Sequence, residues 1–308
     1  MTVEKLSVAG FLAFLTCLPS SFCFQASPPP VSEIVKRSIL ANTADWTAQP
    51  QYSYREREIK TKVDASGRVQ SGESKTSEVS MVEGSPYSRL IAVDNHPFNR
   101  EQQETEQVKF STELARRQHE SPSERRSRVS KYEVARQEEH LLMQQMTEAF
   151  TFSLAGDQEL AGVDCYVLDA RPNPSYQPPV EKARVLLGMK GQLWIDKQHY
   201  HWVKVQAEVI NPVQFGLFVA KVKPGTRFEL EQAAVGDVWL PKHFSESVNA
   251  TIFGFYGMRN NEEDLYSDYR SIQLAPASVQ LTAKAAASDA GSASARRSTA
   301  ATTEVAVR

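Results

Sequence analysis

The pattern of hydrophobic and polar positions changes its period twice along the chain. Polar and apolar residues alternate from Tyr52 to Val63 and from Val69 to Val82, and residues 64–67 between them, Asp-Ala-Ser-Gly, are typical of a hairpin turn. Tyr87 to Val93 predicts a third strand. Because these segments carry many charged and polar side chains, we expect an antiparallel sheet with one face in water.

Helical spacing replaces the alternation between Phe98 and Phe150, where the composition turns to Glu, Gln, Arg and Lys. Residues 121–124, Ser-Pro-Ser-Glu, form a capping box with proline at the first helical position. We predict two helices, about Glu101 to His119 and Pro122 to Ala149. The second carries an apolar stripe made of Val129, Tyr132, Leu142, Met143, Met146 and Phe150.

Strands return after Thr151, and a short helix is expected earlier, from Val31 to Asn42. The later alternating segments are Tyr200 to Ile210, Thr226 to Gln232, His243 to Tyr256 and Tyr266 to Leu274. The sequence thus predicts an α+β fold with an open, curved antiparallel sheet of roughly ten strands packed against helices. After Pro276 the chain consists mainly of Ala, Ser and Thr with scattered charges, so residues 276–308 are expected to form a disordered tail.

Two glycine-led segments carry the most specific pattern in the chain. The first has Gly156, Gly162, Tyr166 and Leu168; the second has Gly191, Leu193, Trp194, Ile195 and Asp196, followed by the alternating Val203, Val205, Ala207 and Val209. This pattern resembles the LolA/LolB-like periplasmic lipoprotein carriers and the related lipid-sensing domain of RseB. The resemblance implies a half-barrel sheet over residues 31–275, with a helical insertion at about 99–149. Gly162 and Gly191 both precede strand residues, and we predict a positive φ at each.

The first residues favour export. Lys5 precedes an apolar run from Leu6 to Leu18, which is the length of a signal-peptide core and short for a membrane span. We predict a signal peptide over residues 1–26 and a periplasmic or secreted protein, with a retained anchor as the alternative. Phe14 to Cys17 has the outline of a lipidation motif, but Thr16 and Pro19 disfavour a lipid anchor. Cleavage would leave Cys165 as the only cysteine, which we expect to be buried in a strand.

Charge and motifs exclude several function classes. A formal net charge of −2 gives no basis for nucleic-acid binding. The sequence has no G-x-S-x-G, H-E-x-x-H, P-loop or G-x-G-x-x-G motif, so we expect a non-enzymatic protein without a cofactor. His199 and His201 lie two apart on a predicted strand near Asp196, and a metal-dependent hydrolase at these residues is an alternative hypothesis.

The resemblance implies a carrier or binding protein that holds a lipid or lipoprotein acyl chain in a hydrophobic hollow between sheet and helices. The candidate ligand-binding residues are Trp194, Phe228, Trp239, Phe253, Phe255, Leu142, Met143 and Met146. Ordinary core packing is the competing interpretation of these side chains. An RseB-like sensor or adaptor that binds a periplasmic or membrane-associated protein is the alternative function.

Overall fold

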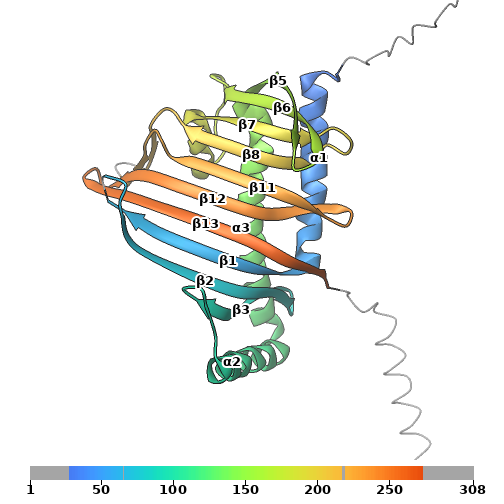
Figure 1. Ribbon diagram of the computed structural model, residues 1–308, viewed down its shortest axis with the longest axis vertical. Helices are drawn as coiled ribbons and strands as arrows, with labels where there is room; N and C mark the ends of the chain where they lie inside the picture. The colour runs from blue at the N-terminus through green and yellow to red at the C-terminus, as the bar shows by residue number, and fades with distance from the viewer. Residues whose placement is uncertain (1–27, 65, 217–218, 273–308) are drawn as a thin grey trace, which may run out of the picture.

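One large antiparallel sheet, crossed on one face by two long helices, forms the body of the molecule (Figure 1). The computed structural model describes residues 28–64, 66–216 and 219–272. The predicted signal peptide, residues 1–26, and the predicted tail, residues 276–308, lie outside the described residues. Within the described part of the chain, no helix combines the length and the apolar character that crossing a membrane requires.

In the described ranges, three α-helices and two short 3₁₀-helices accompany the sheet. They are α1 (Val31–Ala48), η1 (Gln49–Gln51), α2 (Arg100–Gln118), α3 (Pro122–Ala149) and η2 (Glu181–Gly188). The two helices predicted between residues 98 and 150 are confirmed within one residue at each end, while α1 extends to Ala48 instead of ending at Asn42. Figure 1 shows α1 and α3 crossing the same face of the sheet, with α2 beyond the β3 edge.

The described residues contribute thirteen strands to this sheet, more than the ten expected. Their bounds are β1 (Tyr52–Val63), β2 (Val69–Val82), β3 (Ser85–Val93), β4 (His96–Pro97), β5 (Phe150–Leu160), β6 (Val163–Pro172), β7 (Met189–Asp196), β8 (Trp202–Val209), β9 (Val213–Phe215), β10 (Ala220–Val222), β11 (Arg227–Val235), β12 (Val238–Ile252) and β13 (Tyr256–Ser271). The short β4, β9 and β10 carry too few residues to show a period of their own. The predicted strand His243 to Tyr256 is wrong at its end: β12 begins five residues earlier and stops at Ile252, because residues 253–255 form a tight turn. After this turn β13 begins ten residues before the predicted Tyr266.

The sheet is open, because its strand order runs β4-β3-β2-β1-β13-β12-β11-β8-β7-β6-β5 and the two end strands do not pair. The last strand among the described residues, β13, inserts beside β1, so the middle of the sheet joins segments about 200 residues apart. The α+β class with an open antiparallel sheet packed against helices is therefore confirmed.

Side-chain caps fix where helices α2 and α3 begin. Asn99 caps α2 and Ser121 caps α3, each in a reciprocal capping box with the residue three positions later. At its other end α3 continues into β5 without a connecting loop, since Ala149 is the last helical residue and Phe150 the first of the strand. Asn173 then donates from its backbone and side-chain nitrogens to the carbonyls of Ala149 and Glu148, which satisfies acceptors at the helix end.

A buried Arg network holds the start of α3 and the end of α2 against the turn between β2 and β3. The Arg117 guanidinium donates to the carbonyls of Val82 and Ser85, and Arg128 donates to the Ser85 hydroxyl and the Glu83 carbonyl. Glutamates 113 and 120 pair with these two arginines. The polar composition of α2 and α3 therefore includes structural anchors as well as side chains in water.

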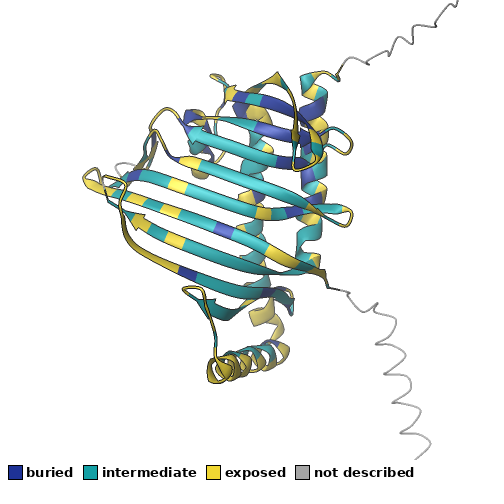
Figure 2. Cartoon of the chain, viewed as in Figure 1, coloured by how far each residue is buried: buried dark blue, intermediate teal, exposed yellow. Residues whose placement is uncertain are grey.

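The apolar core lies on the helix side of the β5–β8 half of the sheet. Residues at the centre of this core include Ile34 on α1, Leu168 on β6 and Ile195 on β7, all fully buried. Figure 2 shows buried segments, in dark blue, gathered on these strands and on α1. A smaller cluster occupies the opposite face and contains Cys165 and Trp194. The expected burial of Cys165 is confirmed, and burial, followed by nearby Asp carboxylates, raises the pKa of its thiol to about 11.

Gly162 and Gly191 have different roles. Gly162 has φ +82°, as predicted for a turn before β6, and that backbone conformation favours glycine. The positive φ predicted for Gly191 is wrong: it lies inside β7 and is absent from the residues with positive φ. Instead, a Cβ at Gly191 would lie 2.5 Å from the carbonyl oxygen of Gln206. A close approach of two strands is therefore what requires glycine there.

Candidate functional site

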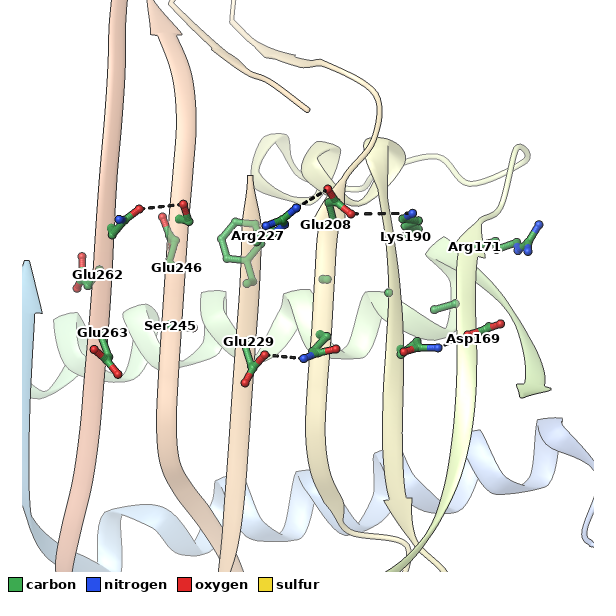
Figure 3. A pocket seen from close by; sticks show the side chains of 18 residues that line it. Asp169, Arg171, Lys190, Glu208, Arg227, Glu229, Ser245, Glu246, Glu262 and Glu263 are labelled. Atoms are coloured by element: carbon green, nitrogen blue, oxygen red, sulfur yellow. Dashed lines mark hydrogen bonds and ion pairs between the residues drawn. The ribbon is translucent and has the colours of Figure 1, made fainter. Parts of the chain in front are cut away.

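A hollow of about 810 Å³ lies on the face of the sheet that points away from α1 and α3 (Figure 3). Strand alternation gives this orientation, because Leu168 and Leu193 pack in the helix-side core and their neighbours point the other way. Two cross-strand rows line the hollow, called here the polar rows. One contains Asp169, Gln192, Gln206, Glu229, Ser245 and Glu263, and the other contains Arg171, Lys190, Glu208, Arg227, Ser247 and Asn261.

Most charges in and beside the polar rows are paired across neighbouring strands. Lys204 donates to Glu229 at 2.7 Å and to Glu231 at 2.9 Å, and Gln206 donates to Glu229 at 2.6 Å. Burial is the largest single effect on the pKa of Glu229, and by itself it would raise that pKa. The hydrogen bonds from Lys204 and Gln206 together outweigh burial, so the pKa of Glu229 lies below its usual value. An acyl chain laid here would remove these groups from water without replacing their hydrogen bonds. This face therefore suits a polar ligand.

The helix-facing side of the sheet is different, because one cross-strand row on it changes from apolar to acidic. In order across the sheet, this row, called the helix-side row, contains Leu168, Leu193, Val205, Leu230, Phe244, Asp264 and Glu58. Leu168 and Leu193 are buried, whereas Val205, Leu230 and Phe244 are only half-buried. The row thus presents an apolar surface about 19 Å wide, from β6 to β12, next to a carboxylate group.

Asp264 is the most deeply placed of these carboxylates, at 8% exposure. Ligand oxygens of Glu58, Glu262 and Asp264 lie within 4.8 Å of one another, an arrangement that could hold a hard cation. Burial, then the neighbouring carboxylates Glu262, Glu56 and Glu58, raise the pKa of Asp264 to about 6. Lys60 pairs with Glu58 and, at 3.6 Å, with Glu262, so part of the negative charge already has a partner.

Replacing Asp264 by Asn should stabilise the protein at neutral pH. Folding raises the pKa of Asp264, so between about pH 4 and 6 the folded state keeps a proton that the unfolded state has lost. The contribution of this group to the free energy of unfolding therefore falls as pH rises through that window. The full shift corresponds to about 3 kcal/mol, and partial hydration reduces the expected gain to about 1 kcal/mol at pH 7. Urea unfolding at pH 4 and pH 7 measures it; equal effects of Asp264→Asn at both pH values would contradict this account.

The two histidines of the alternative metal hypothesis, which lie just before β8, do not converge. His201 Nδ1 lies 2.6 Å from Asp45 Oδ2 on α1, and its ring stacks on Trp239 with the ring centroids 5.7 Å apart. His199 points into solvent, with 71% of its side chain exposed, and the centroids of the two imidazoles are 6.3 Å apart. Among the described residues, the carboxylates at Asp264 form the only group of three or more potential metal ligands, and neither histidine belongs to it.

The structure places the eight predicted ligand-binding residues in three separate regions. Leu142, Met143 and Met146 on α3 and Phe228 on β11 are half-buried against the helix-side core. Trp194 and Trp239 belong to the cluster on the opposite face, where the Trp194 indole donates to Gln158. Phe253 and Phe255 are exposed at the turn between β12 and β13.

The acidic end of the helix-side row was not anticipated from the sequence, although a signal for it exists. Glu56 and Glu58 are two apart on β1, as are Glu262 and Asp264 on β13, so each pair shares a face. Burial and the neighbouring Glu58 raise the pKa of Glu56, and burial and Glu262 raise that of Glu246 on β12. Their convergence depends on the pairing of β1 with β13, which local patterns do not specify.

Comparisons with known proteins return structural matches only: no family model and no curated protein matches the chain. A DUF1329 family protein from Desulfovibrio piger is 11% identical, with 80% of this chain and 94% of that chain covered and a TM-score of 0.32. A putative outer membrane lipoprotein-sorting protein domain from Vibrio parahaemolyticus is 14% identical, with 78% and 94% covered and a TM-score of 0.32. A LolA superfamily protein from Nitrosomonas europaea is 10% identical, with 80% and 96% covered and a TM-score of 0.26. The family that the sequence resembles is thus among the structural matches, and at these TM-scores the likeness carries no argument about ligands.

Proposed function

We propose that the protein is an exported, non-enzymatic carrier or binding protein whose ligand is a lipid or a lipoprotein acyl chain held on the helix side of the sheet. The helix-side row is the observation that carries the proposal. Of its half-buried apolar members, Val205 packs against the same core as Met143 and Met146 of α3, and Leu230 and Phe244 continue that face of the sheet. A flexible apolar ligand could cover this surface. The thioethers of Met143 and Met146 suit such a ligand because unbranched side chains adapt to irregular shapes.

The span of α3 supports this location. The helix has 28 residues and is therefore about 42 Å long. Nine inter-strand steps separate β3 from β5, which amounts to about 43 Å. The helix packs against β3 near its start and against β5 and η2 near its end, so it bridges the full width of the sheet. The half-buried row on the central strands lies between these two contacts.

The acidic end of the row restricts the chemistry of the ligand. A carboxylate or phosphate head group near Asp264, Glu58 and Glu262 would meet like charge. We therefore expect a neutral or cationic acyl compound to bind better than a free fatty acid with the same chain. The preference should weaken below about pH 6, because protonation of Asp264 removes one negative charge.

Met146→Trp tests the proposal. If an acyl chain lies beside Met146, the indole should fill its space and lower the affinity for a fluorescent monoacylglycerol at least tenfold, while the protein stays folded. Val134→Trp is the matched control, because Val134 is on the same helix and half-exposed to solvent. Ordinary core packing predicts instead a stability loss of about 1 to 3 kcal/mol and no saturable binding by the unmodified protein. The absence of such binding at micromolar lipid would remove the support for the carrier.

A protein-binding adaptor is the second candidate, and the hollow between the polar rows favours it. Its paired charges and amides could exchange their partners for those of an extended polypeptide. Gln206→Trp would block this hollow without touching α3. A purified complex with another exported protein that survives Met146→Trp but is lost in Gln206→Trp would favour the adaptor over the carrier.

A further inference from the structure

The β12–β13 hairpin ends in a group of exposed aromatic side chains. The last paired residues are Ile252 and Tyr256, and Phe253 and Gly254 between them have φ values of +51° and +77°. Phe253 is 64% exposed, Phe255 85% and Tyr256 64%. Adjacent aromatic side chains in water are unfavourable unless they serve a contact. We call Phe253, Phe255 and Tyr256, with the neighbouring Val219, the hairpin tip.

The hairpin tip projects beyond the adjacent strand on one side. The pairing of β1 with β13 ends at Lys62 and Asn260, whereas the pairing of β12 with β13 continues to Tyr256. Four further residues of extended chain reach about 13 Å. On the other side β10 pairs along β12, and the Phe253 nitrogen donates to the Val219 carbonyl at 3.0 Å. Figure 1 shows this turn at the left end of the sheet, away from α1 and α3.

The strands that carry the hairpin tip are basic. Residues 213–225 and 247–261 contain Lys221, Lys223 and Arg259 and no Asp or Glu, which gives a local charge of +3 in a chain with a net charge of −2. On the paired strands Lys221 lies opposite Thr251, which is two residues from Phe253 and four from Phe255. Positive charge and aromatic side chains therefore meet at one end of a molecule that is acidic elsewhere.

We infer that the hairpin tip docks on the surface of an anionic lipid bilayer. Aromatic rings favour the boundary between head groups and acyl chains, and each lysine near an anionic surface contributes about 1 kcal/mol. The extension of about 13 Å exceeds the 5 to 10 Å depth at which interfacial side chains are buried. The tip can therefore enter the head-group region before the polar body of the sheet reaches it. This docking does not require the proposed acyl site on the helix side.

Sedimentation with phosphatidylcholine vesicles, with and without phosphatidylglycerol, tests the inference on the full chain. We expect binding to the anionic vesicles, a loss of about tenfold in partition for Phe253→Ser with Phe255→Ser, and a similar loss for Lys221→Glu with Lys223→Glu. Val108→Ser and Lys36→Glu are the controls, because both residues are exposed on other elements. Phe253, Phe255 and Lys221 are exposed and Lys223 is half-buried, and none of the four belongs to the apolar core, so the melting temperature should change little.

Three results would overturn the docking: no vesicle binding, equal binding to neutral and anionic vesicles, or binding that survives both paired variants. A tip that serves a protein partner would give the first of these. The monoacylglycerol assay in solution separates this inference from the proposed function. Variants of the tip should keep that affinity, whereas Met146→Trp should lose it and still sediment with anionic vesicles.

Discussion

Asp45→Ala should lower the free energy of unfolding by about 3 kcal/mol, because it breaks a buried charged hydrogen-bond pair. Asp45 is 3% exposed on α1; its Oδ2 accepts from His201 at 2.6 Å and its Oδ1 accepts from the Trp239 backbone nitrogen at 3.0 Å. This carboxylate therefore joins the helix to β12 and to the residue that precedes β8. A loss of this size corresponds to a fall in melting temperature of roughly 6 to 12 °C, measurable by calorimetry.

Asp45→Asn is the matched control for that loss. Its amide oxygen can still accept from Trp239, so the expected cost is about 1 kcal/mol. Combining Asp45→Ala with His201→Ala should cost much less than the sum of the single changes, since both remove the same interaction. Equal effects of Ala and Asn at position 45, or additive single and double variants, would show that the pair does not hold the helix.

Gly191→Val should destabilise the protein by about 3 kcal/mol, because the new side chain on β7 would clash with the backbone of β8. The new Cβ would lie 2.5 Å from the Gln206 carbonyl oxygen, so β7 and β8 would have to separate. Gly72→Val on β2 is the control, because the nearest atom to a Cβ there is 3.5 Å away. Chemical unfolding of both variants measures the difference. If both cost the same, the close approach at Gly191 would not be the cause.

Periodicity and capping predicted the elements well, because both depend on neighbouring residues. The capping box at Ser121 marked the start of α3, and the alternation in Tyr52–Val63 marked β1. The faces were harder to predict. The pairing of β7 with β8 shifts register between Trp194, which lies opposite Lys204, and Ile195, which lies opposite Trp202. This bulge changes the phase of alternation in β8, so Trp202 lies in the helix-side core while Trp194 lies on the opposite face. A bulge is not visible in a hydrophobic pattern.

The candidate site depended still more on non-local pairing. Asp264 lies opposite Glu58 only because the last strand inserts beside the first, and neither residue signals the other in the sequence. Phe253 and Phe255 were also misplaced by local reasoning. Their alternation suggested a strand that lines an interior, whereas the turn at Gly254 places both side chains at the exposed end of the β12–β13 hairpin. The sequence therefore identified these aromatic residues as candidates for a contact, but it did not predict whether they are buried or exposed.

The two anchored ends of α3 also have a mechanical consequence. The arginine network holds its start at the β3 edge, and the peptide bond from Ala149 to Phe150 ties its end to the β5 edge. A helix anchored at both ends sets the distance between these two parts of the sheet, and with it the curvature of the sheet. Displacing α3 as a lid would require breaking one of the two anchors. Removing one helical turn would shorten α3 by about 5.4 Å and bend the strands between its two ends, so the length of α3 is itself a determinant of how much room lies beneath it.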